Sequence, residues 1–251
     1  INTFDGSIVA KEREMKVFVC TGAIGHDSST TNFVVEEFIK GLIKHGNEDV
    51  TVFYANLLNY HIEFCDGSIQ PFITGKTQSS DDMVFLEKEM LSSDLIVIAS
   101  PVYANTVSGS IKTFIDRIAH WTHLFRLCGK YGALFSISSN SGAEDTLNYL
   151  NDIMGTMGLS IVCKEGFITN TYTKEAIKNI LDVQSALVIK KIESGALEFS
   201  YDQEYNFKKY QKLYSNGKGY ANELDYWKSN KMFEVESLSQ LAKTYSGGVI
   251  L

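Results

Sequence analysis

Residues 95–100, with the sequence LIVIAS, are apolar at every position before the final serine. A strand with one face in water alternates apolar and polar side chains, whereas a strand that is apolar throughout is buried on both faces, as in the centre of a parallel sheet. Parallel strands require crossover connections, which are usually helices. This run therefore favours an α/β fold whose sheet is covered by helices on both faces.

The rest of the chain alternates in the manner that such a sheet requires. After the first strand, Val35, Phe38, Ile39, Leu42 and Ile43 follow the spacing of one helical face. Similar helical stripes lie around residues 83–90, 111–119, 147–157 and 174–193. Further strands are predicted at residues 15–21, 50–57, 131–138 and 159–168. We therefore expect a doubly wound, five-stranded parallel sheet.

The predicted sheet divides the chain into three parts. Residues 1–14 form an N-terminal arm, residues 15–195 the α/β domain and residues 196–251 a C-terminal extension. The extension contains seven of the thirteen tyrosines, and a helix is predicted over about residues 230–245. We expect the extension to pack on its own core, cover a subunit interface or form a wall of a substrate pocket. Residues 59–80 read as a long loop, which favours a functional role.

Composition excludes several classes of partner. Lys and Arg number 23 against 30 Asp and Glu, a net charge of −7, which disfavours a nucleic-acid backbone. No run of about 18 apolar residues predicts a membrane span, and the first 14 residues lack the order of a signal peptide. The four cysteines form no CxxC motif, which is typical of a reducing compartment. We therefore expect a cytoplasmic protein without nucleic-acid or membrane partners.

Three segments rich in Ser, Thr, Asn and Gly follow predicted strands, at residues 21–31, 100–108 and 138–143. Ligands of doubly wound sheets bind at the carboxyl ends of the strands. The first segment leads directly into a helix, so its amides, with the hydroxyls of Thr21, Ser28, Thr30 and Thr31, are suited to a monophosphate. An ordinary Ser/Thr helix cap is the alternative.

Other candidate motifs fail on their spacing. Gly75-Lys76-Thr77 lacks the upstream glycine of a P-loop, since Gln70 stands there, and no GxGxxG follows the first strand. His120 and His123 supply too few ligands for a metal, so no metal site is predicted. The adjacent Asp116 and Arg117 are interpreted as capping or oligomer contacts.

The second segment carries the most specific pattern. Ser100-Pro101-Val102-Tyr103, followed by residues 107–109 and a helix with Lys112, Phe114, Asp116 and Arg117, resembles the signature of the flavodoxin-like NAD(P)H-dependent FMN reductase family. The resemblance covers about residues 15–195 in element order. In the first segment, Gly22, Ser28 and Thr30 match the family's phosphate loop, whereas Ala23, Ile24, Gly25 and Ser29 depart from it.

Related iron–sulfur flavoproteins carry a cysteine cluster before a DDM sequence. Residues 81–83 match that sequence here, but Cys65 is the one thiol in the preceding segment. A four-thiolate cluster cannot be built from one cysteine. The segment 59–80 is therefore expected to shape the rim of the flavin site instead.

The resemblance implies FMN as cofactor and NAD(P)H as co-substrate, with the chemistry carried by the flavin and no catalytic side chain assigned. Tyr103 and His120 are candidates for the pocket. The residues expected to bind FMN are Thr21, Gly22, Ser28, Ser29, Thr30, Thr31, Ser100, Pro101, Val102, Tyr103, Ala104, Asn105, Thr106, Ser138, Ser139, Asn140, Ser141 and Gly142.

The activity that the resemblance implies is an FMN-dependent oxidoreductase. It would accept hydride from NAD(P)H and pass electrons to a small molecule such as a quinone, a flavin, a nitro or azo compound, or a specialised metabolite. The family favours a homodimer or homotetramer. One alternative is a flavodoxin-type electron carrier without its own NAD(P)H site, against which the chain length of 251 residues counts. Another is an interaction role without FMN.

Overall fold

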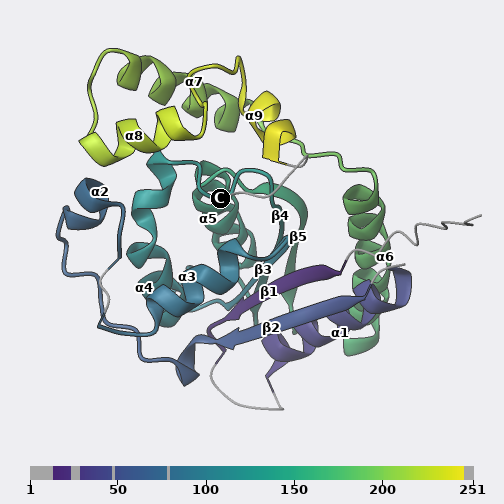
Figure 1. Ribbon diagram of the computed structural model, residues 1–251. Coiled ribbons are helices and arrows are strands. Elements are labelled where there is room, and N and C mark those ends of the chain that lie inside the picture. Colours follow the sequence, from purple (N-terminus) through teal and green to yellow (C-terminus); the bar gives the residue numbers. More distant parts are fainter. Residues whose placement is uncertain (1–13, 24–28, 47–48, 78–79, 246–251) are drawn as a thin grey trace, which may run out of the picture.

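The computed structural model describes residues 14–23, 29–46, 49–77 and 80–245. Its sheet has five parallel strands in the order β2-β1-β3-β4-β5. This order confirms the predicted flavodoxin-like, doubly wound fold (Figure 1). The strands are β1 (Met15–Thr21), β2 (Val50–Asn56), β3 (Leu95–Pro101), β4 (Tyr131–Ser138) and β5 (Ser160–Ile168).

Helices cover both faces of the sheet. One face packs against α1 (Thr30–His45) and α6 (Lys174–Glu193), and the other against α3 (Met83–Leu91), α4 (Gly109–Arg117) and α5 (Ala143–Thr156). Along β3, Ile96 and Ile98 enter one core, while Leu95, Val97 and Ala99 enter the other. All five side chains are fully buried, which explains why this strand is apolar throughout.

The C-terminal extension folds into a small helical layer with its own core. It comprises α7 (Tyr201–Ser215), α8 (Ala221–Ser229) and α9 (Leu238–Tyr245). Trp227 is fully buried and packs among residues of all three helices together with Leu124, Phe125 and Cys128. The predicted helix from residue 230 is wrong over its first eight residues. The chain turns there, with Lys231 at a φ of 55°, and α9 begins at Leu238.

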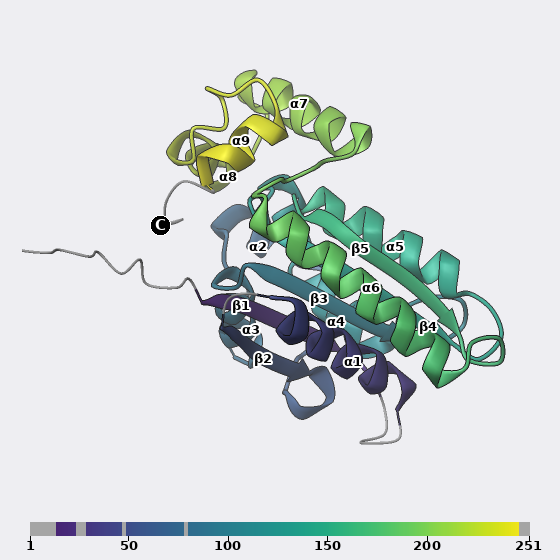
Figure 2. The same ribbon diagram turned by 90° about the vertical axis from the view of Figure 1, so that its right-hand side faces the viewer.

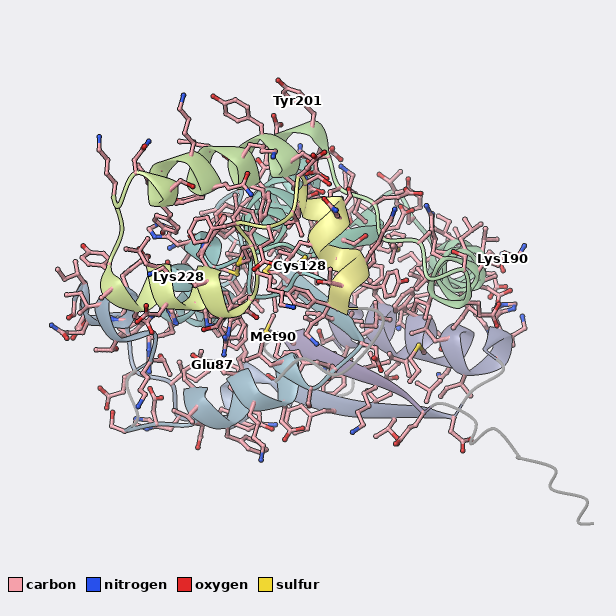
Figure 3. The ribbon with its side chains drawn as sticks, turned by 45° about the horizontal axis from the view of Figure 1, so that its top comes forward. Glu87, Met90, Cys128, Lys190, Tyr201 and Lys228 are labelled. Carbon is pink, nitrogen blue, oxygen red and sulfur yellow. The ribbon has the colours of Figure 1, made fainter. Side chains whose placement is uncertain are left out.

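The extension lies at the edge of the sheet where the strands begin. Leu124, Phe125 and Cys128, on which it packs, directly precede β4. Figure 2 shows the three helices at one end of the sheet, with the β4–α5 connection at the opposite end. Cys128 lies beneath this layer, whereas Tyr201 points outwards from the start of α7 and is 80% exposed (Figure 3). Within one chain, the part of the extension that the structure describes, residues 196–245, therefore forms no wall at the carboxyl edge.

Two short 3-10 helices and one short α-helix complete the described elements. The 3-10 helix η1 (Leu57–Asn59) follows β2, and η2 (Ala119–His123) follows α4. The helix α2 (Gln70–Thr74), within the segment expected to be a loop, packs against α8. None of the helices in the described ranges is long and apolar enough to cross a membrane.

Candidate functional site

The three polar segments meet at the carboxyl edge of the sheet. They follow β1, β3 and β4, which are neighbours in the sheet order. Gly22 lies so close to the start of α4 that a Cβ there would clash with the hydroxyls of Ser108 and Ser110. On the other side, a Cβ on Gly142 would lie 2.6 Å from Asn105 Oδ1. The second segment thus touches both others, at the point where the strand order reverses.

The first segment presents unshielded amides at the start of α1. Ser29 is the N-cap residue, yet its side chain makes no capping hydrogen bond to the described residues. The first turn of α1 contains no carboxylate, so nothing on that turn repels an anion. Thr21 and Thr31 are buried, and Thr21 Oγ1 accepts a hydrogen bond from the amide of Ala23 at 3.3 Å. Thr30 is half-buried.

The predicted residue Ser28 lies outside the described residues, as do Ile24 and Gly25 of the same segment. The part of the segment that is described supplies backbone amides and short hydroxyls rather than cations. Such a helix start is suited to a phosphate group.

The second segment contains a tight turn over residues 103–106. The Tyr103 amide donates to the Thr106 carbonyl at 2.9 Å, and the Thr106 amide donates to the Tyr103 carbonyl at 3.1 Å. Ala104 and Asn105 have φ values of 49° and 60°, which makes this a type I′ turn. The left-handed backbone conformation is unfavourable for alanine, and it is typical of a site that the surrounding structure holds in place. All four residues are exposed, so the turn projects from the sheet edge with the Tyr103 ring accessible.

Two of the serines predicted to contact FMN, Ser100 and Ser138, also form hydrogen bonds within the loops. Ser100 is fully buried, accepts a hydrogen bond from the Ser108 amide at 2.9 Å and donates to the Pro101 carbonyl at 2.8 Å. Ser138 Oγ accepts from the amides of Asn140 and Ser141 at 3.2 and 3.0 Å. Both hydroxyls form hydrogen bonds within their own loops, and these bonds fix the conformation of the loops.

The exposed residues of the third segment are Ser139, Asn140 and Ser141. Gly142 follows with a φ of 81° and caps the start of α5. Val102 joins the second segment to β4, because its amide donates to the Ile137 carbonyl at 2.8 Å. Pro101 and Val102 are half-buried between the two segments. The loops therefore form one continuous polar edge.

His120 is not brought to this edge. The helix α4 starts beside the loops and runs away from them, so η2, which contains His120, lies near the opposite edge against Phe72 and Trp121. Burial lowers the pKa of His120 to about 4, with a smaller contribution from Arg126, so the ring is neutral. His123 pairs with the buried Glu223 at 2.7 Å. No group of three potential metal ligands occurs in the part of the chain that the structure describes.

The expected roles of Asp116 and Arg117 also require correction, since these neighbours have different partners. Asp116 pairs with Lys112, whereas Arg117 forms a buried ion pair with Asp81. Burial alone would raise the pKa of Asp81, but hydrogen bonds from Arg117 and from the amides of Glu63 and Met83 outweigh it and lower the pKa below its usual value. Arg117 also donates to the Glu63 carbonyl at 2.9 Å.

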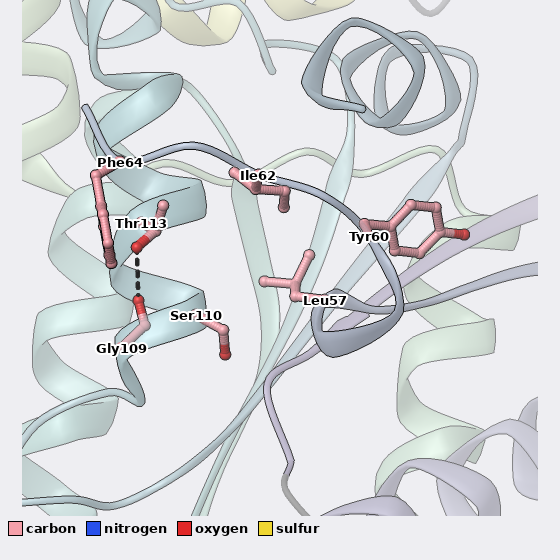
Figure 4. A pocket seen from close by; sticks show the side chains of 7 residues that line it. All are labelled: Leu57, Tyr60, Ile62, Phe64, Gly109, Ser110 and Thr113. Carbon is pink, nitrogen blue, oxygen red and sulfur yellow. Dashed lines mark hydrogen bonds between the residues drawn. The ribbon is translucent and has the colours of Figure 1, made fainter. Parts of the chain in front are cut away.

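A pocket of about 360 Å³ lies between the segment that follows β2 and the first turns of α4. Its lining, shown in Figure 4, comprises Leu57, Tyr60, Ile62, Phe64, Gly109, Ser110 and Thr113. The sequence prediction did not identify this pocket. The signal for it is the alternation of apolar and polar residues in 60–64, YHIEF, which places three apolar side chains on one side of an extended segment.

Comparison with known proteins gives the same result for fold and family. Residues 15–174 match a family described as NADPH-dependent FMN reductase. An iron-sulfur flavoprotein of Archaeoglobus fulgidus is 31% identical over 114 residues, which cover 45% of this chain and 52% of the relative. An FMN-dependent NADH:quinone oxidoreductase of Ralstonia nicotianae is 22% identical over 173 residues, which cover 59% and 83% of the two chains.

Among solved structures, a flavone reductase is similar in fold, with a TM-score of 0.58 at 15% sequence identity. The similarity covers 74% of this chain and 66% of that chain. The aligned part of this chain thus spans about half the length of the Archaeoglobus relative and about two thirds of the flavone reductase.

Proposed function

The chain belongs to the NADPH-dependent FMN reductase family, and from this premise we propose that it is an oxidoreductase that uses FMN and NAD(P)H to reduce a small-molecule acceptor. The observation that carries the proposal is the meeting of three polar loops where the strand order reverses. The loops contain the projecting turn at 103–106 and the left-handed Gly142. The turn at 103–106 and the chain around Gly142 both lie at the edge of the sheet, where a ligand can approach the main chain.

The residues at this edge fit FMN. The amides at the start of α1, with the hydroxyls of Ser29 and Thr30, would hold the phosphate, because no carboxylate occupies that first turn. Ser28, which the sequence analysis also expects to bind FMN, is part of the same proposed phosphate site. The exposed residues 103–106 and 139–141 would bind the edges of the ring system and orient it. When bound, FMN supplies the redox chemistry, accepting hydride from NAD(P)H and passing two electrons to the acceptor.

This proposal is tested first by anaerobic mixing of the FMN-loaded protein with NADPH and then with NADH. We expect the absorption of the flavin to bleach within seconds. A flavin that is reduced by dithionite but by neither nicotinamide would contradict the reductase and support the electron carrier. Absence of flavin binding, with thermal stability unchanged by added FMN, would overturn both.

The phosphate site is tested separately by the double substitution Ser29→Ala with Thr30→Ala. We expect the Kd for FMN to rise by about a hundredfold or more, since each hydrogen bond to a charged group is worth about 1.5 to 3 kcal/mol and two are removed. Ser215→Ala is the matched control, because its hydroxyl bonds to the Gln211 carbonyl within α7. Unchanged FMN affinity in the double variant would show that the phosphate does not bind at the start of α1.

For the acceptor we propose a quinone, a flavin, or a nitro or azo compound, and for the assembly a homodimer or homotetramer. Ile43 on α1 and Val183 and Leu187 on α6 are 57%, 59% and 48% exposed, and they support burial of this helical face in an assembly. Light scattering during size exclusion measures the mass. A monomer at micromolar concentration would overturn the proposed assembly.

A further inference from the structure

The three polar segments that would bind FMN contain no positively charged Lys or Arg side chain. Residues 21–31, 100–108 and 138–143 include no lysine and no arginine. A phosphate monoester carries roughly 1.5 to 2 negative charges at pH 7. The amides and hydroxyls at the start of α1 supply hydrogen bonds and a partial positive charge, but no full charge. A lysine or arginine from another part of the chain would therefore meet an unbalanced negative charge at a bound phosphate.

The helix α6 begins at the same edge of the sheet as α1. Both helices follow strands of one parallel sheet, β5 and β1, so both start at its carboxyl edge, as Figure 2 shows. The two helices approach closely where Gly41 meets Ser185, because a Cβ on Gly41 would lie 2.3 Å from the Ser185 hydroxyl. That hydroxyl also lies 3.0 Å from the Phe38 carbonyl oxygen, within hydrogen-bonding distance. This packing fixes α6 relative to the start of α1.

Lys174, the first residue of α6, reaches across to α1. Its ammonium nitrogen lies 5.2 Å from the centre of the Phe33 ring, a cation–π contact. Phe33 lies in the first turn of α1, which begins at Thr30. Because side chains on a helix lean towards its N-terminus, the Phe33 ring covers the start of the helix. The contact therefore holds the positive charge of Lys174 beside the helix start that would bind the phosphate.

The position of Lys174 is unfavourable for its own helix. Positive side chains stabilise the last turn of a helix and oppose the helix dipole at the first turn. Lys174 is exposed, and no carboxylate of the described residues forms an ion pair with it. The Thr173 hydroxyl caps α6 by accepting from the Ala176 amide at 3.2 Å, whereas the start of α1 has no such cap. Neither helix stability nor an ion pair therefore explains a lysine at this position.

We propose that Lys174 is a phosphate-binding residue of the cofactor site, and that its charge makes the site selective for FMN over flavins that lack a phosphate monoester. The amides and hydroxyls at the start of α1 would position the phosphate, and Lys174 would neutralise part of its charge. The inference rests on the proposed function, because it requires the FMN phosphate to bind at the start of α1. NADPH also carries a phosphate monoester, so the test includes both nicotinamide nucleotides.

The test compares FMN with riboflavin, which has the same ring system and ribityl chain but no phosphate. Quenching of flavin fluorescence gives the Kd of each for the full chain freed of flavin, at low ionic strength. We expect Lys174→Met to raise the Kd for FMN about three- to tenfold and to leave the Kd for riboflavin within about twofold, because the charge acts on the phosphate. The effect on FMN should shrink in about 0.5 M NaCl, since salt screens the charge of an exposed side chain.

Two further variants separate the charge of Lys174 from its packing. Lys178→Met is the matched control, because Lys178 is also exposed and lies about one turn further along α6. This variant loses the same charge, and both Kd values should stay within about twofold of the wild-type values. Lys174→Arg keeps the charge and should retain most of the affinity for FMN. Thermal unfolding of the three variants without flavin checks that each is folded.

Several results would overturn the proposal. An equal rise of both Kd values in Lys174→Met would show that Lys174 has a structural role, and an unchanged Kd for FMN would show that the phosphate binds without this lysine. A rise in the KM for NADPH but not for NADH, with the Kd for FMN unchanged, would assign Lys174 to the nucleotide instead. Equal affinity of the wild-type protein for FMN and riboflavin would contradict the phosphate site at α1. Absence of flavin binding would contradict the proposed function itself.

Discussion

The buried pair of Arg117 and Asp81 is the most consequential residue contact outside the loops. Their side chains are 3% and 0% exposed, and Arg117 also donates to the Glu63 carbonyl. An ion pair in such surroundings adds little net stability, but the removal of one partner leaves the other charge buried. The pair thus fixes the segment between β2 and α3 at a definite position.

Arg117→Gln should destabilise the protein by about 3 to 5 kcal/mol, because it leaves the Asp81 carboxylate uncompensated. Urea unfolding at pH 7 measures the change. The double variant Arg117→Gln with Asp81→Asn should recover part of the loss. Because the pKa of Asp81 is lowered in the folded state, the stabilisation is present above its ordinary pKa of 3.8 and is lost as pH falls through the folded value. Additive losses in the double variant would contradict the pairing.

Glu87 on α3 should make stability fall with rising pH. Burial raises its pKa to about 7 from 4.5, against the opposing effect of Arg126, and Oε1 has no hydrogen-bond partner among the described residues. The folded state therefore favours the protonated acid, and stability is lost as pH rises from about 4.5 through about 7. At pH 8.5 the free energy of unfolding of Glu87→Gln should exceed that of the wild type by about 1 to 3 kcal/mol. Urea unfolding at pH 5 and pH 8.5 tests this prediction. The same change in the free energy of unfolding between the two pH values in both proteins would contradict it.

At the scale of elements, the buried strands and the long amphipathic helices were predictable from sequence. The predicted bounds of β4 and the predicted range 174–193 of α6 agree with the structure. Burial of both faces of a strand gives a continuous apolar run, and burial of one face of a helix gives apolar residues at helical spacing. In the extension, α7 and α8 were missed. Their few buried residues pack around Trp227 rather than on the sheet, although Ser200 and Gln203 form a capping box that marks the start of α7.

The polar edge was predictable as a set of segments but not as a set of contacts. The composition of the segments located the loops, whereas the internal bonds of Ser100 and Ser138 depend on how the chain turns after each strand. The same holds for the type I′ turn at 103–106. Its left-handed Ala104 is not a residue that turn statistics favour, so sequence gives no signal for it.

Substitutions at Ala104 should report on that turn. At a φ of 49°, Ala104→Val should destabilise the protein by about 1 to 2 kcal/mol, because a β-branched side chain is disfavoured in the left-handed region. Ala104→Gly should preserve or slightly increase stability, since glycine adopts this conformation without strain. Thermal unfolding of the two variants measures the difference. Equal losses for both substitutions would show that the turn is not left-handed in solution.

At the scale of the whole molecule, the two edges of the sheet carry different structures. The polar loops lie at the carboxyl edge, and the helices α7, α8 and α9 pack at the other (Figure 2). The extension holds its place through apolar packing around Trp227 and through the buried pair of Glu223 with His123. The described part of the extension therefore packs away from the polar loops of its own chain.

Trp227→Ala should loosen the extension without abolishing binding at the loops. Removal of this fully buried ring should destabilise the packing by about 3 to 5 kcal/mol and expose residues 196–245 to limited proteolysis. The Kd for FMN should change by less than about twofold, because the site lies at the opposite edge. Loss of FMN affinity in protein whose sheet remains folded by circular dichroism would contradict this separation.

The amides of His61 and Glu63 donate to Asp82 at 2.7 Å and to Asp81 at 2.9 Å, and this main-chain clamp has a consequence for how this protein can diversify. The clamp uses amides and a carbonyl, which every residue other than proline provides, so it is indifferent to the side chains at 60, 62 and 64. Substitutions at these three positions can therefore change the shape of the pocket wall while the framework stays the same. Variation at positions 60, 62 and 64 would thus alter the pocket and leave the sheet unchanged.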